Sequence, residues 1–326
     1  MKNDVSDNMP YKITNYRRII ANCRAKSTPY RGIVLIVFSA VLFGTTGTSQ
    51  ALAPEGISSS AIGCLRLIIG GPALLILTSV FNRTNPLTLR PPLIPTFIAA
   101  CGVVMFQLCF FDAVARTGVA LGTIVAICIA PVFAGFLSAI FQKERLSLSW
   151  AVASTLAIAG CVILGTAGGG AIKVDMMGIV LAAGAGFGYA VSLVGSKKVI
   201  SDHSPAMGIS IILCVGALLV TPKIMTEDLT QVMTRNGLAV ILYLGIIATA
   251  APYLLLATGL STVPVSHTSI IMLAEPLTGC MLGVLLLGEK FTLTLALGST
   301  LIFCGLVIIS VGNNIRLPSK IQNGTI

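Results

Sequence analysis

Apolar stretches with almost no charged residues recur along the chain, separated by short polar connections. A stretch of about 20 apolar residues is long enough to cross the hydrocarbon core of a bilayer as a helix. The pattern therefore predicts ten transmembrane helices, with boundaries uncertain by a few residues. They lie at about 32–51, 59–81, 93–111, 118–141, 148–166, 177–196, 205–225, 237–258, 264–287 and 293–312.

A repeated motif divides these helices into two sets of five. Pro131 in the fourth stretch is followed by Glu144 and then Arg145, and in the ninth stretch Pro276 is followed at the same spacing by Glu289 and a lysine. The two copies are 145 positions apart. Because each copy holds an odd number of helices, the second copy enters the membrane in the opposite orientation. This is the inverted-repeat plan of many secondary transporters.

The predicted fold is therefore an all-α integral membrane protein whose ten transmembrane helices form two inverted five-helix repeats. The first repeat covers residues 32–166 and the second covers residues 177–312. A basic tail at 1–31 precedes them, and a short tail at 313–326 follows.

Composition and charge support this interpretation. The chain is 55% hydrophobic and 10% charged, whereas a soluble domain carries about 25% charged residues, so a soluble protein is excluded. If the amino terminus is cytosolic, fifteen of the 21 Lys and Arg residues fall on the cytosolic side and five on the other. That bias predicts cytosolic amino and carboxyl termini. The net charge of +10 does not indicate nucleic-acid binding, because seven of the positive residues belong to the tail before the first helix.

Several kinds of chemistry have no support in the sequence. The nine cysteines form no CxxC pair and lie mostly in apolar stretches, where they are small packing residues, and two histidines are too few for a histidine-based metal site. No GxxxxGK[ST] loop is present. We therefore expect no metal, no cofactor and no enzyme activity, and transport driven by an ion gradient, the membrane potential or exchange.

The repeated Pro and Glu-Arg/Lys motif, the stretch FGTTGTSQ at 43–50 and Arg66 early in the second helix resemble the EamA-type members of the drug/metabolite transporter superfamily. The resemblance covers about residues 32–312. It implies a carrier of the bacterial inner membrane, most often an exporter of amino acids or related metabolites. It does not imply a particular substrate.

Two charged residues lie well inside the predicted spans, away from their ends. Glu275 is near the centre of the ninth, where a carboxylate costs about 2.5 to 3.5 kcal/mol to insert, so it should face protein or water. It could bind a substrate ammonium, carry a coupling proton, or serve as a static partner in the core. Arg66 could hold a substrate carboxylate, or it could brace the outer end of the bundle against carbonyls or Glu275, which we favour. Together the two would match a zwitterion.

Polar and proline residues complete the candidate site. The polar residues could line a cavity between the repeats or simply hold helices together. They are Thr46, Gln50, Gln107, Tyr189, Tyr253 and Ser269. Pro131 and Pro276 could be gating hinges or plain kinks. His267, near the cytosolic end of its span, is expected to be solvated or to cap a helix.

These observations favour a secondary transporter that exports amino acids or related small metabolites by alternating access, with protons as a possible coupling ion. An alternative within the same superfamily is a sugar-nucleotide or phosphate-ester exchanger, which needs several Lys or Arg residues to hold phosphate. An alternative of another class is a membrane receptor or structural protein, which would leave the repeat unexplained.

Overall fold

The computed structural model describes residues 29–82, 91–117, 119–167, 175–202, 204–287 and 292–311. Within these ranges every regular element is helical and no strand is present. Most of the predicted tail at 1–31, the tail at 313–326 and Glu289 of the repeated motif lie outside the described residues.

The helices follow the predicted order along the chain. In the first half they are α2 (Pro29–Ala51), α3 (Ser59–Asn82), α4 (Leu93–Thr117), α5 (Val119–Phe141) and α6 (Leu148–Ala167). In the second half they are α7 (Met176–Asp202), α8 (Pro205–Ile224), η2 (Gln231–Met233), α9 (Arg235–Gly245), η3 (Ile246–Ala250), α10 (Ala251–Leu260), α11 (Val265–Ile271), α12 (Ala274–Leu287) and α13 (Leu293–Val311).

Eight spans in the described part of the chain are long and apolar enough to cross a membrane. Two shorter apolar segments, Val125–Phe141 in α5 and Leu148–Leu164 in α6, accompany them. The structure is thus that of an all-α protein with many membrane-spanning helices, and the number ten stays a prediction.

Two of the predicted continuous helices are interrupted. The stretch at 237–258 consists of α9, the π-helical turn η3 and α10, and the stretch at 264–287 is divided into α11 and α12 by a turn at Met272 and Leu273. The continuous helix predicted at 264–287 would place Pro276 in its middle, but Pro276 lies in the first turn of α12, where the missing N–H has little cost. Pro131 does lie inside a helix, α5.

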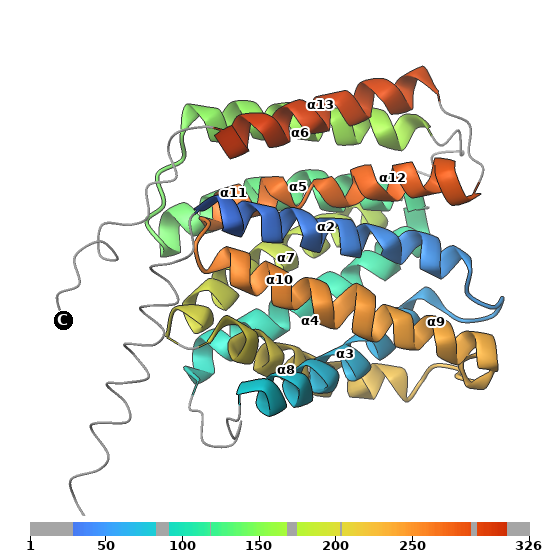
Figure 1. The fold of residues 1–326 in the computed structure, drawn as a ribbon. Coiled ribbons are helices and arrows are strands. Elements are labelled where there is room, and N and C mark those ends of the chain that lie inside the picture. Colours follow the sequence, from blue (N-terminus) through green and yellow to red (C-terminus); the bar gives the residue numbers. More distant parts are fainter. Residues whose placement is uncertain are drawn as a thin grey trace, which may run out of the picture.

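Helices from the two halves of the chain pack against each other throughout the bundle. In Figure 1, α6 and α13 form a pair along one side, and α4 lies along α7. α3 packs against α8, and α2 contacts both α10 and α12. The interface between the two halves therefore runs through the whole molecule.

Glycines allow the closest of these contacts. A Cβ atom built on Gly102 of α4 would lie 2.6 Å from the amide nitrogen of Ser192 and 2.7 Å from the carbonyl oxygen of Gly188 in α7. Both neighbours are backbone atoms, which cannot rotate away. Small residues at helix contacts are the usual device by which membrane helices approach closely.

The bundle has two ends, which we name after one carboxylate at each. At the Glu144 end, the connection 142–147 meets the connection 261–264, because Glu144 accepts a hydrogen bond from the amide of Val265. At the Glu227 end, the connection after α8 meets the start of α3, because Glu227 accepts a hydrogen bond from Ser58.

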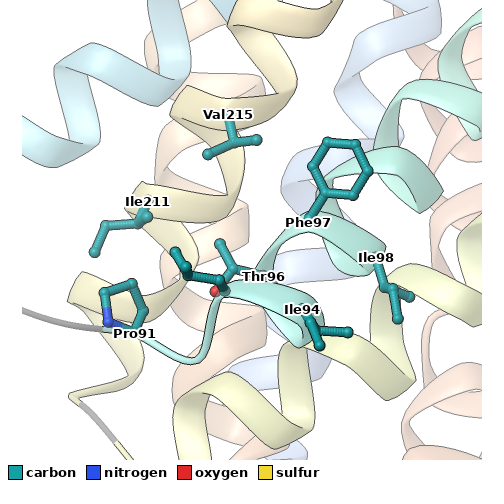
Figure 2. Close-up of a pocket in the computed structure, with 8 residues that line it drawn as sticks. Pro91, Ile94, Thr96, Phe97, Ile98, Ile211 and Val215 are labelled. Carbon is teal, nitrogen blue, oxygen red and sulfur yellow. The ribbon is translucent and has the colours of Figure 1, made fainter.

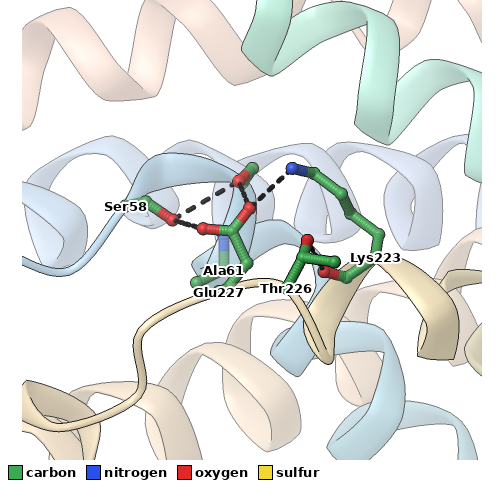
Figure 3. A network of polar contacts seen from close by, with 6 residues as sticks. Ser58, Ala61, Lys223, Thr226 and Glu227 are labelled. Atoms are coloured by element: carbon green, nitrogen blue, oxygen red, sulfur yellow. Dashed lines mark hydrogen bonds and ion pairs between the residues drawn. The ribbon is translucent and has the colours of Figure 1, made fainter.

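The contact at the Glu227 end is a compact polar network, which Figure 3 shows. The carboxylate of Glu227 accepts hydrogen bonds of 2.5 Å from Ser58 and Ser60 and pairs with Lys223 at 2.8 Å. Ser58 also caps α3 by accepting from the amide of Ala61 at 3.1 Å. The hydrogen bond from Lys223, together with those from the two serines, lowers the pKa of Glu227 to about 2.

We predict that Gly102→Ala destabilises the protein by about 1–3 kcal/mol, because overpacking forces the α4 and α7 backbones apart. The melting temperature of the purified protein in detergent measures this loss. Gly47→Ala is the matched control, since nothing lies within 4 Å of a Cβ at that position. An equal melting temperature for Gly102→Ala and the wild type would contradict the close contact.

We predict that Glu227→Gln is less stable than the wild type at neutral pH. The pKa of this carboxyl is lower in the folded protein than the unfolded value of about 4.3, so its stabilising contribution is complete above that value. It fades as the pH falls toward 2, where the variant and the wild type should converge. Melting temperatures across pH test this, with Glu55→Gln in the exposed loop at the same end as control. A difference that stays constant down to low pH would refute the interpretation.

Candidate functional site

Arg66 of α3 is held at the interruption between α9 and α10. Pro252 has no N–H, so the carbonyl of Ala248 loses its ordinary α-helical donor four residues later. The Nη2 of Arg66 donates to that carbonyl at 3.0 Å, and its Nε donates to the hydroxyl of Thr249 at 2.8 Å. Thr249 in turn donates to the carbonyl of Leu244 at 2.7 Å. Arg66 is only 8% exposed, and two of its three nitrogens serve the π-helical turn.

Aromatic side chains join this arginine to α2. The guanidinium carbon of Arg66 lies 6.0 Å from the centre of the Phe43 ring, within the range of a cation–π contact. Phe43 packs edge to face on Tyr253 of α10, with ring centres 5.1 Å apart. The hydroxyl of Ser39 donates to the carbonyl of Pro252 at 2.7 Å. Helices α2, α3 and α10 therefore meet at one point in the bundle.

Glu275 lies near this meeting point, in the first turn of α12. Its amide donates to the carbonyl of Met272 at 3.0 Å, and its own carbonyl faces Gly44 of α2, where a Cβ would come within 2.7 Å of it. Its side chain interacts electrostatically with Arg66, but the described residues give the two no ion pair within 4.0 Å. Within that part of the chain the carboxylate has no hydrogen-bond partner.

Three side chains share this environment. Glu275 interacts electrostatically with Tyr189 of α7 and with Tyr253, which places the three in one region of the bundle. Each keeps part of its surface accessible although protein atoms surround it. A carboxylate and two phenol rings thus converge between the two halves of the chain.

Two hydroxyl groups among the predicted site residues are buried and unpaired. Within the described residues, the hydroxyl oxygens of Thr46 and Tyr189 have no hydrogen-bond partner. A buried polar group without a partner costs about 1–3 kcal/mol, so each of these two hydroxyls would gain from a hydrogen bond to water or a ligand admitted when the helices part. The Tyr189 ring is fixed by Phe106, whose ring centre is 5.8 Å away.

The remaining predicted residues are engaged by the protein itself. The amide of Gln50 donates to the hydroxyl of Ser59 at 2.8 Å, and that of Gln107 donates to the carbonyl of Gly63 at 2.9 Å. Ser269 donates to the carbonyl of Ser266 within α11 at 2.9 Å. Gln107 and Ser269 are 4% and 2% exposed. These three side chains therefore already have partners within the protein, unlike the hydroxyls of Thr46 and Tyr189.

Of the two expectations for His267, solvation or helix capping, solvation is wrong. His267 is 5% exposed, and its Nδ1 lies 3.3 Å from the hydroxyl of Ser266. The residues that sequence analysis missed are Phe43, Thr249 and Pro252, which fix the position of Arg66. Pro252 inside an apolar stretch could have indicated this site, because a proline within a helix leaves the carbonyl four residues before it without its usual N–H donor.

A cleft on the side of the bundle is a poor candidate for a polar ligand. It lies between the start of α4 and α8, has a volume of about 470 Å³, and is lined almost entirely by apolar side chains such as Ile94, Phe97 and Ile211 (Figure 2). Among the described residues, no group of three His, Cys, Asp or Glu side chains gathers that could hold a metal ion.

Comparison with known proteins adds independent findings. A family model described as the EamA-like transporter family matches residues 30–166 and again residues 176–311. The uncharacterized transporter YwfM of Bacillus subtilis (strain 168) is 38% identical over 277 residues, covering 85% of this chain and 93% of the relative. The threonine/homoserine exporter RhtA of Escherichia coli (strain K12) is 26% identical over 296 residues, covering 89% of this chain and 94% of the exporter. A solved crystal structure with a TM-score of 0.73 and 21% identity covers 85% of this chain and 95% of its own, and shows likeness of fold alone.

We predict that Arg66→Gln lowers the stability by about 1–3 kcal/mol, because the carbonyl of Ala248 loses its donor. Pro252→Ala restores an N–H that can reach the same carbonyl, so the loss caused by Arg66→Gln should be smaller in that background. Melting temperatures of the two single variants and the double variant form the required cycle. An equal loss with and without Pro252 would show that Arg66 does not act through this carbonyl.

Proposed function

We propose that this chain, which belongs to the EamA-like transporter family, exports amino acids or related small metabolites as a secondary transporter. Membership of that family makes it a membrane transporter and not an enzyme. In this mechanism a site between the two halves opens alternately to each side of the membrane. The observation that carries the proposal is the Glu275 carboxylate, which lies at a helix break between the halves with no partner in the described part of the chain.

The proposed architecture has ten crossings in two inverted repeats, residues 32–166 and 177–312. The two separate matches of the family model, at 30–166 and 176–311, support it. The excess of Lys and Arg on one side supports a cytosolic location for the tails at 1–31 and 313–326. The bacterial relatives support the inner membrane as the location.

The site residues have distinct proposed roles. Glu275 binds the ammonium group of the substrate or carries a coupling proton. The unpaired hydroxyls of Tyr189 and Thr46 supply hydrogen bonds, and Tyr253 packs beside the ligand. Arg66 positions the π-helical turn. Pro131, inside α5, is proposed as a hinge, whereas Pro276 begins a helix that the turn at Met272 already separates from α11.

The chemistry of the site favours a zwitterionic or cationic solute. RhtA, a distant relative, is named a threonine/homoserine exporter, and both of its named substrates carry an ammonium, a carboxylate and a hydroxyl. A phosphate ester would need a cluster of Lys or Arg residues. The described spans offer Arg66 at this depth, and the hydroxyl of Thr249 and the carbonyl of Ala248 already occupy two of its nitrogens.

The first experiment measures the resistance of cells to toxic amino acids and their analogues. Cells that overproduce the protein are challenged with a panel of amino acids and analogues, and each protective solute is tested in proteoliposomes with an imposed proton gradient or internal counter-substrate. We expect at least one amino acid or related solute to be moved. If none moves under any gradient or exchange condition, the proposed function is wrong.

We predict that Glu275→Gln lowers transport at least tenfold or removes its dependence on the pH gradient, because the amide cannot carry the charge that holds an ammonium or a proton. Initial rates in proteoliposomes measure both effects. Glu55→Gln, in an exposed loop, is the matched control and should transport at the wild-type rate. Unchanged rates for Glu275→Gln at every pH would remove Glu275 from the mechanism.

A further inference from the structure

Helix α11 is buried on all of its faces. Every residue from Val265 to Ala274 is buried, which covers the whole of α11 and the start of α12. The free amides at the start of a helix need hydrogen-bond acceptors, and burial removes water as the source. The residue before α11 is Pro264, whose side chain cannot cap the helix. The acceptors must come from elsewhere in the protein.

Glu144, in the connection between α5 and α6, supplies them. Its carboxylate accepts from the amide of Val265 at 2.8 Å, from the amide of Ser266 at 3.0 Å and from the hydroxyl of Ser266 at 2.7 Å. The chain turns toward this position at Lys143, two residues after α5 ends, which adopts a left-handed conformation with φ of 56°. A negative charge at a helix amino terminus also interacts favourably with the helix dipole.

Lys197 binds the connection 261–264 on the side toward α10. The ammonium of Lys197, on α7, donates to the carbonyls of Leu260 and Val263, the second at 2.6 Å. Leu260 is the last residue of α10, so the cation meets the negative end of that helix. The connection 261–264 is therefore held between an anion at the start of α11 and a cation at the end of α10.

The same connection packs directly on α2. A Cβ built on Gly32 would lie 2.2 Å from the hydroxyl of Thr262 and 2.8 Å from the side chain of Val263. Elements from both halves of the chain thus converge on residues 261–264. Toward the Glu227 end, by contrast, most residues from Glu275 to Leu286 on α12 retain accessible surface. The two ends of this span therefore differ sharply in how much surface they leave accessible.

We propose that Glu144 and Lys197 form a clamp on residues 261–264 that keeps the Glu144 end closed, and that this clamp is released during each transport cycle. The inference rests on the proposed function, because alternating access requires each end to open in turn. Glu144 comes from the first half of the chain, whereas the clamped connection leads through α11 to Glu275. Opening this end separates the two halves at the hydrogen bonds of Glu144, whereas Lys197 lies in the same half as the connection and moves with it.

The contacts are suited to repeated opening. Glu144 keeps part of its surface accessible, so water can replace the amides of α11 when the halves part. A charge-assisted hydrogen bond to an accessible carboxylate can therefore be exchanged without leaving a charge buried. Glu144 acts as a positioning residue, since it touches the gate and not the substrate site.

The test measures opening directly and needs no substrate. Spin labels are attached at Arg145, in the connection after α5, and at Thr258 near the end of α10, both exposed positions on opposite sides of the clamp. The native cysteines are replaced first. Pulsed electron paramagnetic resonance then gives the distribution of distances between the two spin labels in the full-length protein in lipid nanodiscs.

Glu144→Gln should raise the ratio of long to short distances about tenfold, because it removes the charge from the acceptor. Glu55→Gln, a carboxylate removed at the other end of the bundle, should leave the distribution unchanged. An unchanged distribution in Glu144→Gln, whatever its melting temperature, would overturn the proposal and leave Glu144 as a fixed helix cap.

If Glu144→Gln does not fold, Glu144→Asp keeps the charge but shortens its reach and should show a smaller shift in the same direction. Failure of both variants to fold would also overturn the proposal, because a contact that opens in every cycle cannot be indispensable to the fold. The outcome is separate from that of the transport assay. Opening without any transported solute would refute the proposed function and not the clamp.

Discussion

The satisfaction of backbone groups where helices break inside the bundle is the constraint on which the rest of the structure depends. A helix that crosses a membrane without interruption satisfies its own amides and carbonyls, but a broken one exposes them where no water is available. At the π-helical turn, Arg66 donates to the carbonyl of Ala248. At the connection 261–264, Lys197 donates to carbonyls, and Glu144 accepts from amides. Three charged side chains therefore act as backbone partners, and their positions fix where the helices can bend.

Glu275 differs from these three because the described residues give its carboxylate no hydrogen bond or ion pair. It begins α12, beside Gly44 of α2 and near Tyr189 and Tyr253, where the two halves of the chain meet. A carboxylate there is expensive to maintain, so the lack of a hydrogen bond or ion pair from the described residues points to a mobile partner, either a substrate ammonium or a proton. The clamp at the Glu144 end closes one end of the same span, so the site and the gate lie on one continuous path of backbone.

The amino-acid pattern predicted the membrane class, the family and the order of the helices, because each rests on composition and spacing that a single sequence records. It also identified Glu275 and Arg66 as the charges to examine. It could not predict that Gln107 donates its hydrogen bond to the carbonyl of Gly63, since that contact depends on how the helices face one another, or that Ser269 donates to a carbonyl of its own helix. The break before Pro276 was missed because the apolar run continues through it unchanged. Glu144 was noticed as part of a repeated motif, but its partner lies 121 residues away, beyond the reach of any local pattern.

Glu275, unlike Glu144 and Glu227, accepts no hydrogen bond and forms no ion pair within the described part of the chain. The most direct measurement of this difference is reaction of the membrane-embedded protein with a hydrophobic carbodiimide, followed by mass spectrometry of the peptides. The account predicts modification at Glu275, reduced by a transported solute, with little at Glu144 or Glu227, whose oxygens are occupied by hydrogen bonds. Modification of Glu144 or Glu227 with Glu275 left intact would contradict it.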